Sequence, residues 1–217
     1  MAGKKLNYYA SMSPYVYPFY SLIHPGDGFQ EMKYNKKECL PFGIGVLILW
    51  YITTVLKTQY TDFVFNMQNP DDINIILIFI TTLGVFFIAA IANWSVTTLM
   101  DGEGSFKVIV TSGAYALMPV VFSNIIVTVL SKFLCMDEGV FLTYIEIIAW
   151  IWTALLLVVA LQKIHDFSFG KTLSMLALTV FGVAVIVFLG VLVYSLYQQV
   201  SSFVVGLYYE IIFRFFS

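Results

Sequence analysis

Charged residues are scarce in this sequence: Asp, Glu, Lys and Arg make up only 11% of the 217 residues, whereas 60% are hydrophobic. A soluble domain of this length cannot bury so large an apolar surface, so the composition excludes an ordinary globular fold. The formal net charge of −2 gives no broad basic surface of the kind that binds nucleic acid. We therefore expect the lipid bilayer, rather than water, to surround most of the chain.

Cysteine and histidine are nearly absent, with two residues of each type. Cys39 and Cys135 are predicted at opposite ends of the membrane, which excludes a disulfide between them. His24 and His165 lack the cluster of cysteines or carboxylates that a zinc site needs. We therefore predict no metal, no cofactor and no catalytic residue, and we interpret His165 with Asp166 as a solvated turn.

Long apolar runs are present instead. A helix needs roughly 20 residues, at about 1.5 Å each, to cross a hydrocarbon core of about 30 Å. A transmembrane β-barrel would alternate in polarity over roughly ten-residue segments, but residues 75–92 and 173–197 are apolar on all sides. We predict an all-α, polytopic membrane protein with a five-helix transmembrane bundle over residues 40–197. The predicted spans are residues 40–56, 73–98, 108–134, 140–162 and 172–197.

Two further segments flank the predicted bundle. Residues 1–39 are rich in Tyr, Phe and Pro and become basic at residues 33–37, which favours an N-terminal interfacial arm over a folded domain. Within this arm, residues 24–28 are predicted to form a turn. Residues 198–217 repeat apolar positions at helical spacing, which predicts a C-terminal amphipathic helix. This helix either lies in the outer headgroup layer, the interpretation we prefer, or extends the fifth span outward to cover a partner.

The distribution of Lys and Arg predicts an orientation, because positive charge resists translocation across the membrane. A cytoplasmic N-terminus places eight lysines inside and three basic residues outside, and an odd number of spans then places the C-terminus outside. The inner residues are Lys4, Lys5, Lys33, Lys36, Lys37, Lys107, Lys163 and Lys171, and the outer ones are Lys57, Lys132 and Arg214.

Few polar groups lie deep in the predicted spans. Glu146 lies about two turns into the fourth span, without a basic partner on its own helix face. It has either a structural role or a role in binding an ion or a substrate. Pro119 and Asn124 interrupt the third span, either as a packing kink or as part of a transport path. A small transporter or channel would use these three residues. An intramembrane enzyme, which has the least support, would need a cluster of Tyr115, Asn124 and Glu146.

The segment between the second and third spans is the most distinctive. Gly102 and Gly104 permit a tight turn, and Ser105 is placed to cap the next helix. We predict a contact region for partners here, on the inner side, and a second contact face on the C-terminal helix, on the outer side. The inner region comprises Trp94, Asp101, Gly102, Gly104, Lys107 and Tyr115, and the outer face comprises Phe203, Leu207, Tyr208 and Ile211.

The same segment carries a family resemblance. Trp94, the run Gly102-Glu103-Gly104-Ser105-Phe106-Lys107 and the run Ala114-Tyr115-Ala116-Leu117-Met118-Pro119 resemble the Yip1 domain family. Residues 24–29 and 31–34 resemble its bacterial branch. The resemblance implies a five-helix bundle with a cytoplasmic N-terminus, here in a bacterial plasma membrane. Eukaryotic members bind prenylated Rab-type GTPases and one another, and some bacterial members occur near components of ABC-type sugar transporters.

Together, these observations predict a non-enzymatic adaptor or accessory protein in the membrane. Small residues along the predicted helices allow close helix packing, while the arm and the C-terminal helix offer contact surfaces. The expected partners are the lipid bilayer and other integral membrane proteins, among them ABC transporter permeases or further copies of the chain. We expect no nucleic acid partner.

Overall fold

The computed structural model describes residues 16–34, 39–66 and 73–216. Within these ranges the chain is helical, and five stretches are long and apolar enough to cross a membrane. The prediction of an all-α, five-span membrane protein is confirmed. Residues 1–15 of the predicted arm and the lysines Lys4, Lys5, Lys36 and Lys37 lie outside the described residues.

Each predicted span corresponds to one helix or to two or three consecutive helical segments, with ends that differ from the predicted ends by a few residues. The exception is the fifth, which is far longer than predicted. In chain order the spans are α4 (Leu40–Tyr60), α5 (Ile75–Phe79) with η2 (Ile80–Gly84) and α6 (Val85–Leu99), α7 (Phe106–Ala116) with α8 (Met118–Leu130), α9 (Gly139–His165) after the 3₁₀ turn η3 (Met136–Glu138), and α10 (Phe169–Phe216).

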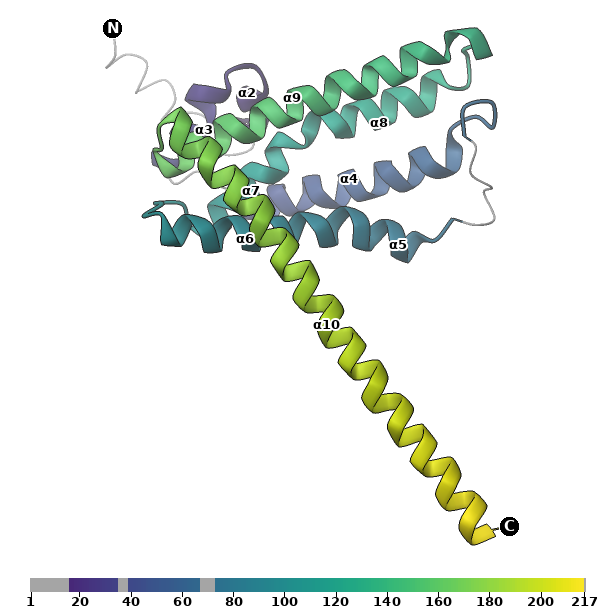
Figure 1. The fold of residues 1–217 in the computed structure, drawn as a ribbon. Coiled ribbons are helices and arrows are strands. Elements are labelled where there is room, and N and C mark those ends of the chain that lie inside the picture. The colour runs from purple at the N-terminus through teal and green to yellow at the C-terminus, as the bar shows by residue number, and fades with distance from the viewer. Residues whose placement is uncertain (1–15, 35–38, 67–72, 217) are drawn as a thin grey trace, which may run out of the picture.

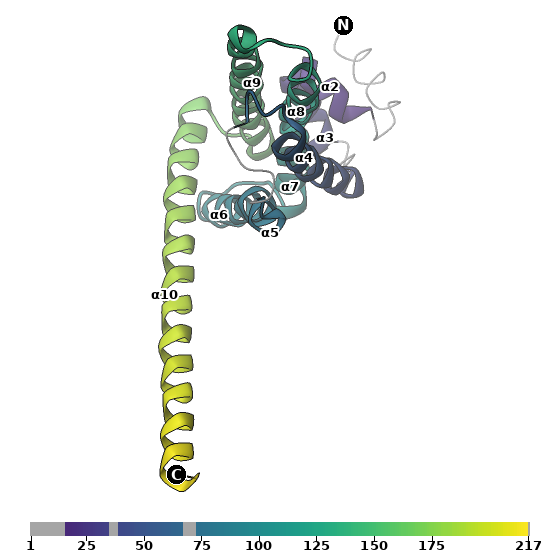
Figure 2. The same ribbon diagram turned by 90° about the vertical axis from the view of Figure 1, so that its right-hand side faces the viewer.

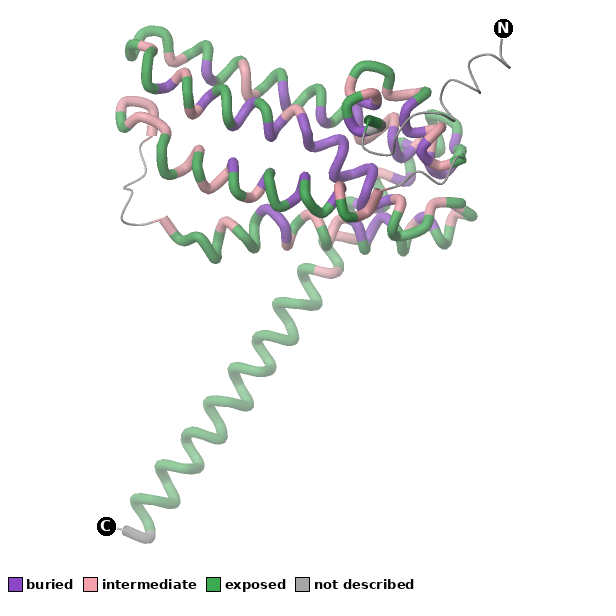
Figure 3. The backbone as a smooth tube through the Cα atoms, turned by 180° about the vertical axis from the view of Figure 1, so that it is seen from behind, coloured by how far each residue is buried: buried purple, intermediate pink, exposed green. Residues whose placement is uncertain are grey.

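The bundle is built around the third span. In Figure 1, α4, α8, α9 and the α5–α6 helix run alongside one another, and α7 lies between them. The third span is 61% buried, against 22–28% for the first, second and fourth spans. Every side of α7 therefore meets another helix, and Figure 3 shows most of the buried backbone there.

A break divides the third span where Pro119 was predicted to interrupt it. α7 ends at Ala116 and α8 begins at Met118, with Leu117 as the residue between them. Proline has no N–H to continue the helical bonding, and the Leu117 carbonyl instead accepts from the N–H groups of Val120 and Val121. The break redirects the chain inside a packed bundle, as a packing kink does.

The second span contains a π-helical turn, η2, that the sequence did not predict. Asn74 caps the start of this span by accepting a hydrogen bond from the Leu77 N–H. At η2, the hydroxyls of Thr81 and Thr82 donate back to carbonyls one turn earlier, to Leu77 and Ile78. Such turns hold one residue more than a normal helical turn, so they change which side of the helix each later residue faces.

The arm differs from the prediction because part of it is folded against the bundle. α2 (Tyr17–Ile23) and α3 (Pro25–Tyr34) form a helical pair, and α3 packs on α9. Phe29 and Met32 are each 1% exposed and belong to one apolar cluster with Tyr115 and Leu156. The predicted turn at residues 24–28 is wrong for the same reason: Pro25 begins α3, and proline suits the first turn of a helix.

α10 is a single helix of 48 residues, so no boundary separates a fifth span from a C-terminal helix at residue 197. The chain follows the alternative in which the last segment extends the fifth span, and not the preferred one in which it lies in the headgroup layer. Figures 1 and 2 show α10 starting beside α6 and then leaving the bundle. Every residue from 187 to 214 is exposed, as the tube in Figure 3 shows.

Candidate functional site

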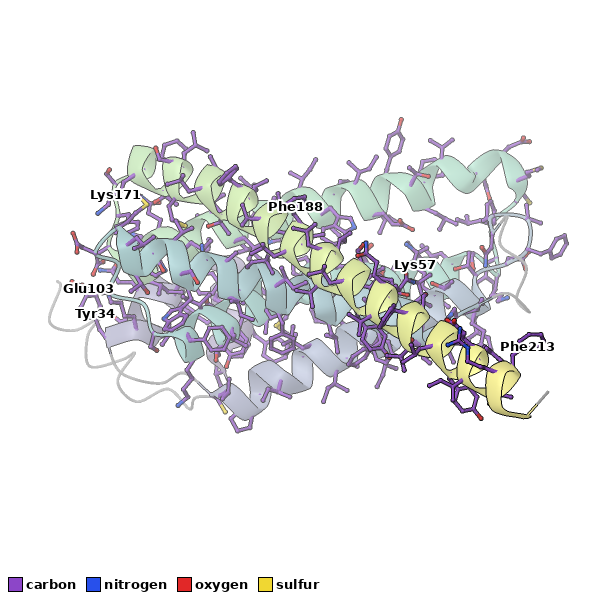
Figure 4. All side chains as sticks on the ribbon, turned by 60° about the horizontal axis from the view of Figure 1, so that its bottom comes forward. Tyr34, Lys57, Glu103, Lys171, Phe188 and Phe213 are labelled. Carbon is purple, nitrogen blue, oxygen red and sulfur yellow. The ribbon has the colours of Figure 1, made fainter. Side chains whose placement is uncertain are left out.

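The functional site we describe lies at the end of the bundle where α3, the α6–α7 loop (residues 100–105) and the α9–α10 turn (residues 166–168) meet. We call it the α3 end. Figure 4 shows Tyr34, Glu103 and Lys171 gathered there from these separate segments. Most of the predicted inner contact residues belong to the loop or flank it.

Lys33 links the three segments. Its Nζ donates to Glu103 Oε2 at 2.7 Å and to Asp166 Oδ2 at 2.5 Å. The Tyr34 hydroxyl donates to the same Asp166 oxygen at 3.0 Å. The Lys33 side chain is only 14% exposed, while Glu103 and Asp166 are 65% and 38% exposed. One lysine thus fixes α3 to the loop on one side and to the turn on the other, and we call this set of contacts the Lys33 clamp.

The charges of the clamp stabilise one another over a wide pH range. Burial disfavours the charged Lys33 ammonium, but hydrogen bonds to Asp166 and Glu103 outweigh it and raise the Lys33 pKa above its ordinary 10.5. The hydrogen bond from Lys33 holds the pKa of the Asp166 carboxyl below its ordinary 3.8. The contribution of Asp166 is therefore present above pH 3.8 and lost as the pH falls through its lower folded pKa. That of Lys33 is lost only as the pH rises past its raised pKa.

We expect Lys33→Gln to lower the melting temperature in detergent by a few degrees at pH 5–9, because exposed ion pairs contribute about 1 kcal/mol or less. The difference from the wild type should shrink as the pH falls below 3.8, where Asp166 becomes protonated. Lys171→Gln is the matched control: Lys171 Nζ donates to the Met100 carbonyl at 2.9 Å, and a carbonyl does not titrate. A Lys33→Gln deficit that does not shrink at all as the pH falls below 3.8 would contradict the clamp.

His165 precedes Asp166 of the clamp and is 2% exposed, so the prediction of a solvated turn is wrong for His165, although Asp166 is exposed and lies in a turn. Its Nδ1 accepts a hydrogen bond from the Gly104 N–H at 3.2 Å, and its ring stacks on Phe167. Because Nδ1 is the acceptor, the proton of the neutral ring is on Nε2. Within the described residues, the buried Nε2 has no hydrogen-bond partner. The imidazole therefore serves as a packing surface for the loop.

The two loop glycines are needed for close approach and not, as predicted, for a tight turn. Neither has a positive φ; the left-handed residue of the turn is Asp101, with φ 56°. A Cβ on Gly102 would lie 2.6 Å from His165 Nδ1 and 2.9 Å from the Thr97 carbonyl oxygen. A Cβ on Gly104 would lie 2.5 Å from His165 Cε1. Each glycine thus lets the loop backbone touch the imidazole.

The remaining inner contact residues differ in exposure. Trp94 is 44% exposed, with its ring edge to face with Phe106, and Asp101 and Lys107 are exposed as well. Ser105 caps α7 as predicted, accepting from the Val108 N–H. Tyr115 is 1% exposed and donates its hydroxyl to the Cys39 carbonyl at 3.3 Å. A partner cannot reach Tyr115 in this packing, and its role as a contact residue stays a prediction.

Comparison with known proteins identifies a family for this chain. The Yip1 domain matches residues 19–211, which is nearly the whole chain. The chain belongs to the Yip1 domain family. No curated protein and no solved structure matches it. The matched range of this Yip1 chain begins in α2 and ends near the C-terminus of α10, so it includes both the Lys33 clamp and the long last helix.

At the opposite end of the Yip1 bundle, Glu146 has a partner that the sequence did not reveal. Lys57 Nζ, on α4, lies 2.7 Å from Glu146 Oε1, on α9. The prediction considered only the face of the helix that carries Glu146, but the cation comes from a neighbouring helix. Asn124 is likewise engaged between helices: its amide donates to the hydroxyls of Thr54 at 3.2 Å and Thr53 at 3.5 Å. Both polar groups therefore join α4 to its neighbours.

The predicted outer contact face lies on the free part of α10. Figure 4 shows Phe188 and Phe213 projecting from this helix, far from one another along its length. Glu210 and Arg214 face each other one turn apart at 3.9 Å, as the sequence order favours. The four predicted residues are all exposed: Phe203 by 70%, Leu207 by 48%, Tyr208 by 60% and Ile211 by 48%.

Proposed function

We propose that this Yip1-domain protein is a non-enzymatic membrane adaptor that binds other integral membrane proteins through α10. One observation carries the proposal: α10 is the most apolar span of the chain and the least buried one. An 18-residue stretch of this helix has a mean hydropathy of 2.9, yet only 6% of that stretch is buried within the chain, against 61% for the corresponding stretch of the third span. The first turns of the helix pack on α6, but the part from residue 187 to 214 is exposed throughout and adds nothing to the bundle.

The length of α10 favours a protein partner over lipid alone. A helix of 48 residues is about 72 Å long, more than twice the hydrocarbon thickness of about 30 Å. In an upright orientation, residues such as Phe203, Leu207 and Ile211 extend past the bilayer into water. Exposed apolar stretches of this extent mark interaction surfaces, because burying them against a partner is favourable.

Purification from native membranes in mild detergent tests the proposal. We expect the full chain to retain a stoichiometric membrane protein partner and a chain ending at Tyr197 to lose it. The truncated chain should keep the melting temperature of the bundle, since residues 198–214 are all exposed. Replacing Phe203, Leu207 and Ile211 with Ser should have the same effect, and Ser201→Ala with Ser202→Ala is the matched control. A full chain that purifies as a monomer without any partner would refute the proposal.

A narrower form of the proposal concerns the identity of the partner. The resemblance to bacterial members favours an ABC-type permease for sugar uptake, and a second copy of the chain is the alternative. The same purification distinguishes them, since the retained protein is identified by mass. An adaptor needs no catalytic residues. In support of this role, the charges of the Lys33 clamp pair with one another and join three segments of the chain.

The proposal extends to orientation. We place the α3 end in the cytoplasm of a bacterium, with the protein in the plasma membrane and its C-terminus outside. The described lysines Lys33, Lys107, Lys163 and Lys171 support this orientation, because each belongs to a segment at or next to the α3 end. Reporter fusions at both termini test this orientation. Reporters that place both termini on the same side of the membrane would contradict it.

A further inference from the structure

A polar cavity opens at the end of the bundle opposite to the clamp, between α4, α8 and α9. Its volume is about 480 Å³. This end of the molecule was predicted to hold an isolated carboxylate, but the structure places a cation, several hydroxyls and an amide around it. The polar residues that line the cavity are Lys57, Thr58, Thr61, Asn66, Thr143 and Glu146.

The wall of the cavity is a well-bonded turn after α4. The Asp62 carbonyl accepts from the N–H groups of Phe65 and Asn66, and the Asn66 amide donates to the Thr58 carbonyl at 2.7 Å. The Asp62 N–H donates to Ser131 Oγ, which ties the turn to the end of α8. Phe65 lies against Gly139, where a Cβ would meet its ring at 2.6 Å. The turn is thus held in place by bonds independent of anything in the cavity.

Lys57 and Glu146, the two charged residues that line the cavity, can bind a ligand and keep their ion pair with each other. The bond of 2.7 Å between Lys57 and Glu146 joins one Nζ to one carboxylate oxygen. An ammonium has three N–H donors, and a carboxylate has two acceptor oxygens, so each group has capacity for a second partner. Their side chains are 28% and 32% exposed, so both are accessible from outside. A group with a negative and a positive charge a few bonds apart complements this arrangement.

The two charges lie near the ends of helices that are long enough to span a membrane, so a bilayer around these helices would have its headgroups near the cavity. Lys57 lies one turn before the end of α4, and Glu146 lies two turns after the start of α9. Val127 and Leu142 also line the cavity, and they supply an apolar floor beneath the charges. A molecule with a zwitterionic end and an apolar body fits a cavity that is lined by charges and by apolar side chains.

We propose that this cavity binds a phosphate joined to a primary ammonium, as in the headgroup of phosphatidylethanolamine. Lys57 and the Thr143 hydroxyl bind the phosphate oxygens, because ammonium and hydroxyl groups both donate to them. The hydroxyls of Thr58 and Thr61 already donate to the backbone carbonyls of Thr54 and Lys57. Glu146 accepts from the ligand ammonium. The site does not depend on α10 or on the adaptor role, since none of its residues comes from that helix.

Native mass spectrometry of the full chain, delipidated in detergent, tests the site with three lipids that share the same acyl chains. Phosphatidylethanolamine has both charges, phosphatidylglycerol has no ammonium, and phosphatidylcholine has an ammonium without N–H donors. We expect phosphatidylethanolamine to bind about tenfold more tightly than either of the other two lipids. One hydrogen bond to a charged group contributes about this factor to the affinity. Glu146→Gln should reduce this preference by about the same factor.

Two further variants separate ligand binding from folding. Thr143→Val keeps the shape of the side chain and leaves the ion pair in place, and we expect it to weaken phosphatidylethanolamine binding about threefold. Glu210→Gln, on the exposed part of α10, should leave binding unchanged. Equal binding of the three lipids, a preference that Glu146→Gln retains, or unchanged phosphatidylethanolamine binding in Thr143→Val would overturn the proposal.

Free phosphoethanolamine distinguishes the two sources of the ligand. If it competes with the lipid in the millimolar range and the lipid binds, the bilayer supplies the ligand. If it binds to the wild type about threefold more tightly than to Thr143→Val, while the lipid binds to neither, the ligand is a soluble molecule with the same chemistry. Failure of both to bind would refute the site and would leave the purification experiment on α10 unaffected.

Discussion

Gly104→Ala is expected to lower the free energy of unfolding by about 3 kcal/mol, a loss of about 6–12 °C in melting temperature. The new Cβ would lie 2.5 Å from His165 Cε1 and 2.6 Å from Ile164 Cγ2, at the buried end of α9. Relief requires the loop to move, and this movement breaks the hydrogen bond from the Gly104 N–H to the imidazole. Thermal unfolding in detergent, followed by tryptophan fluorescence, measures the loss.

Two comparisons show whether the close approach is the cause. Gly45→Ala is the matched control, because a Cβ on Gly45 meets nothing within 4 Å and alanine favours the helix by about 1 kcal/mol. Combining Gly104→Ala with His165→Ala removes one of the two obstructing side chains and should recover part of the loss. If Gly104→Ala melted at the wild-type temperature, the packing of the loop on His165 would be refuted.

Tyr115→Ala is expected to destabilise the fold by about 3–4 kcal/mol, as large-to-small changes of buried aromatic residues do. The ring lies at the centre of the bundle, edge to face with Phe42 at 5.9 Å, in the cluster that contains Phe29 and Met32 of the arm. The cavity left by alanine would loosen α3 and α4 together. The same thermal assay measures the change, and protease cleavage within residues 16–34 reports the release of the arm.

Tyr115→Phe keeps the ring and removes only the hydroxyl, which donates to the Cys39 carbonyl at 3.3 Å. Its expected cost is about 1 kcal/mol or less. The predicted contact role gives the opposite pattern, in which both variants melt like the wild type and lose a partner. That pattern would show that Tyr115 reaches the surface in another conformation.

The fold was predictable to the extent that the bilayer dictates it. Apolar length gave the five spans, Pro119 marked the break between α7 and α8, and Ser105 marked the start of α7, because each signal acts on its own segment. The arm was mispredicted because its aromatic composition also suits an interface. Phe29 and Met32 are buried only because α9 provides a surface for them.

The candidate site was less predictable, because its contacts join residues far apart in the sequence. Asp166 and Lys33 are 133 positions apart, and Glu146 and Lys57 are on different helices. Their pairing depends on the packing order of the helices, which composition and periodicity leave open. The loop glycines were noticed for their turn propensity, but their close approach requires His165, 61 positions beyond Gly104.

The π-helical turn η2 has a consequence for mapping the lipid-facing surface of the second span. A normal helix turns about 100° per residue, and the extra residue in η2 offsets everything after it by about that angle. A stripe drawn on a regular wheel from Ile75 to Leu99 is therefore displaced by about a quarter turn after η2. With the offset, Asn93 faces α10, where its amide meets Met175 and Thr179. When labelling data for this span are mapped on a helical wheel, the residues before and after η2 therefore need separate wheels.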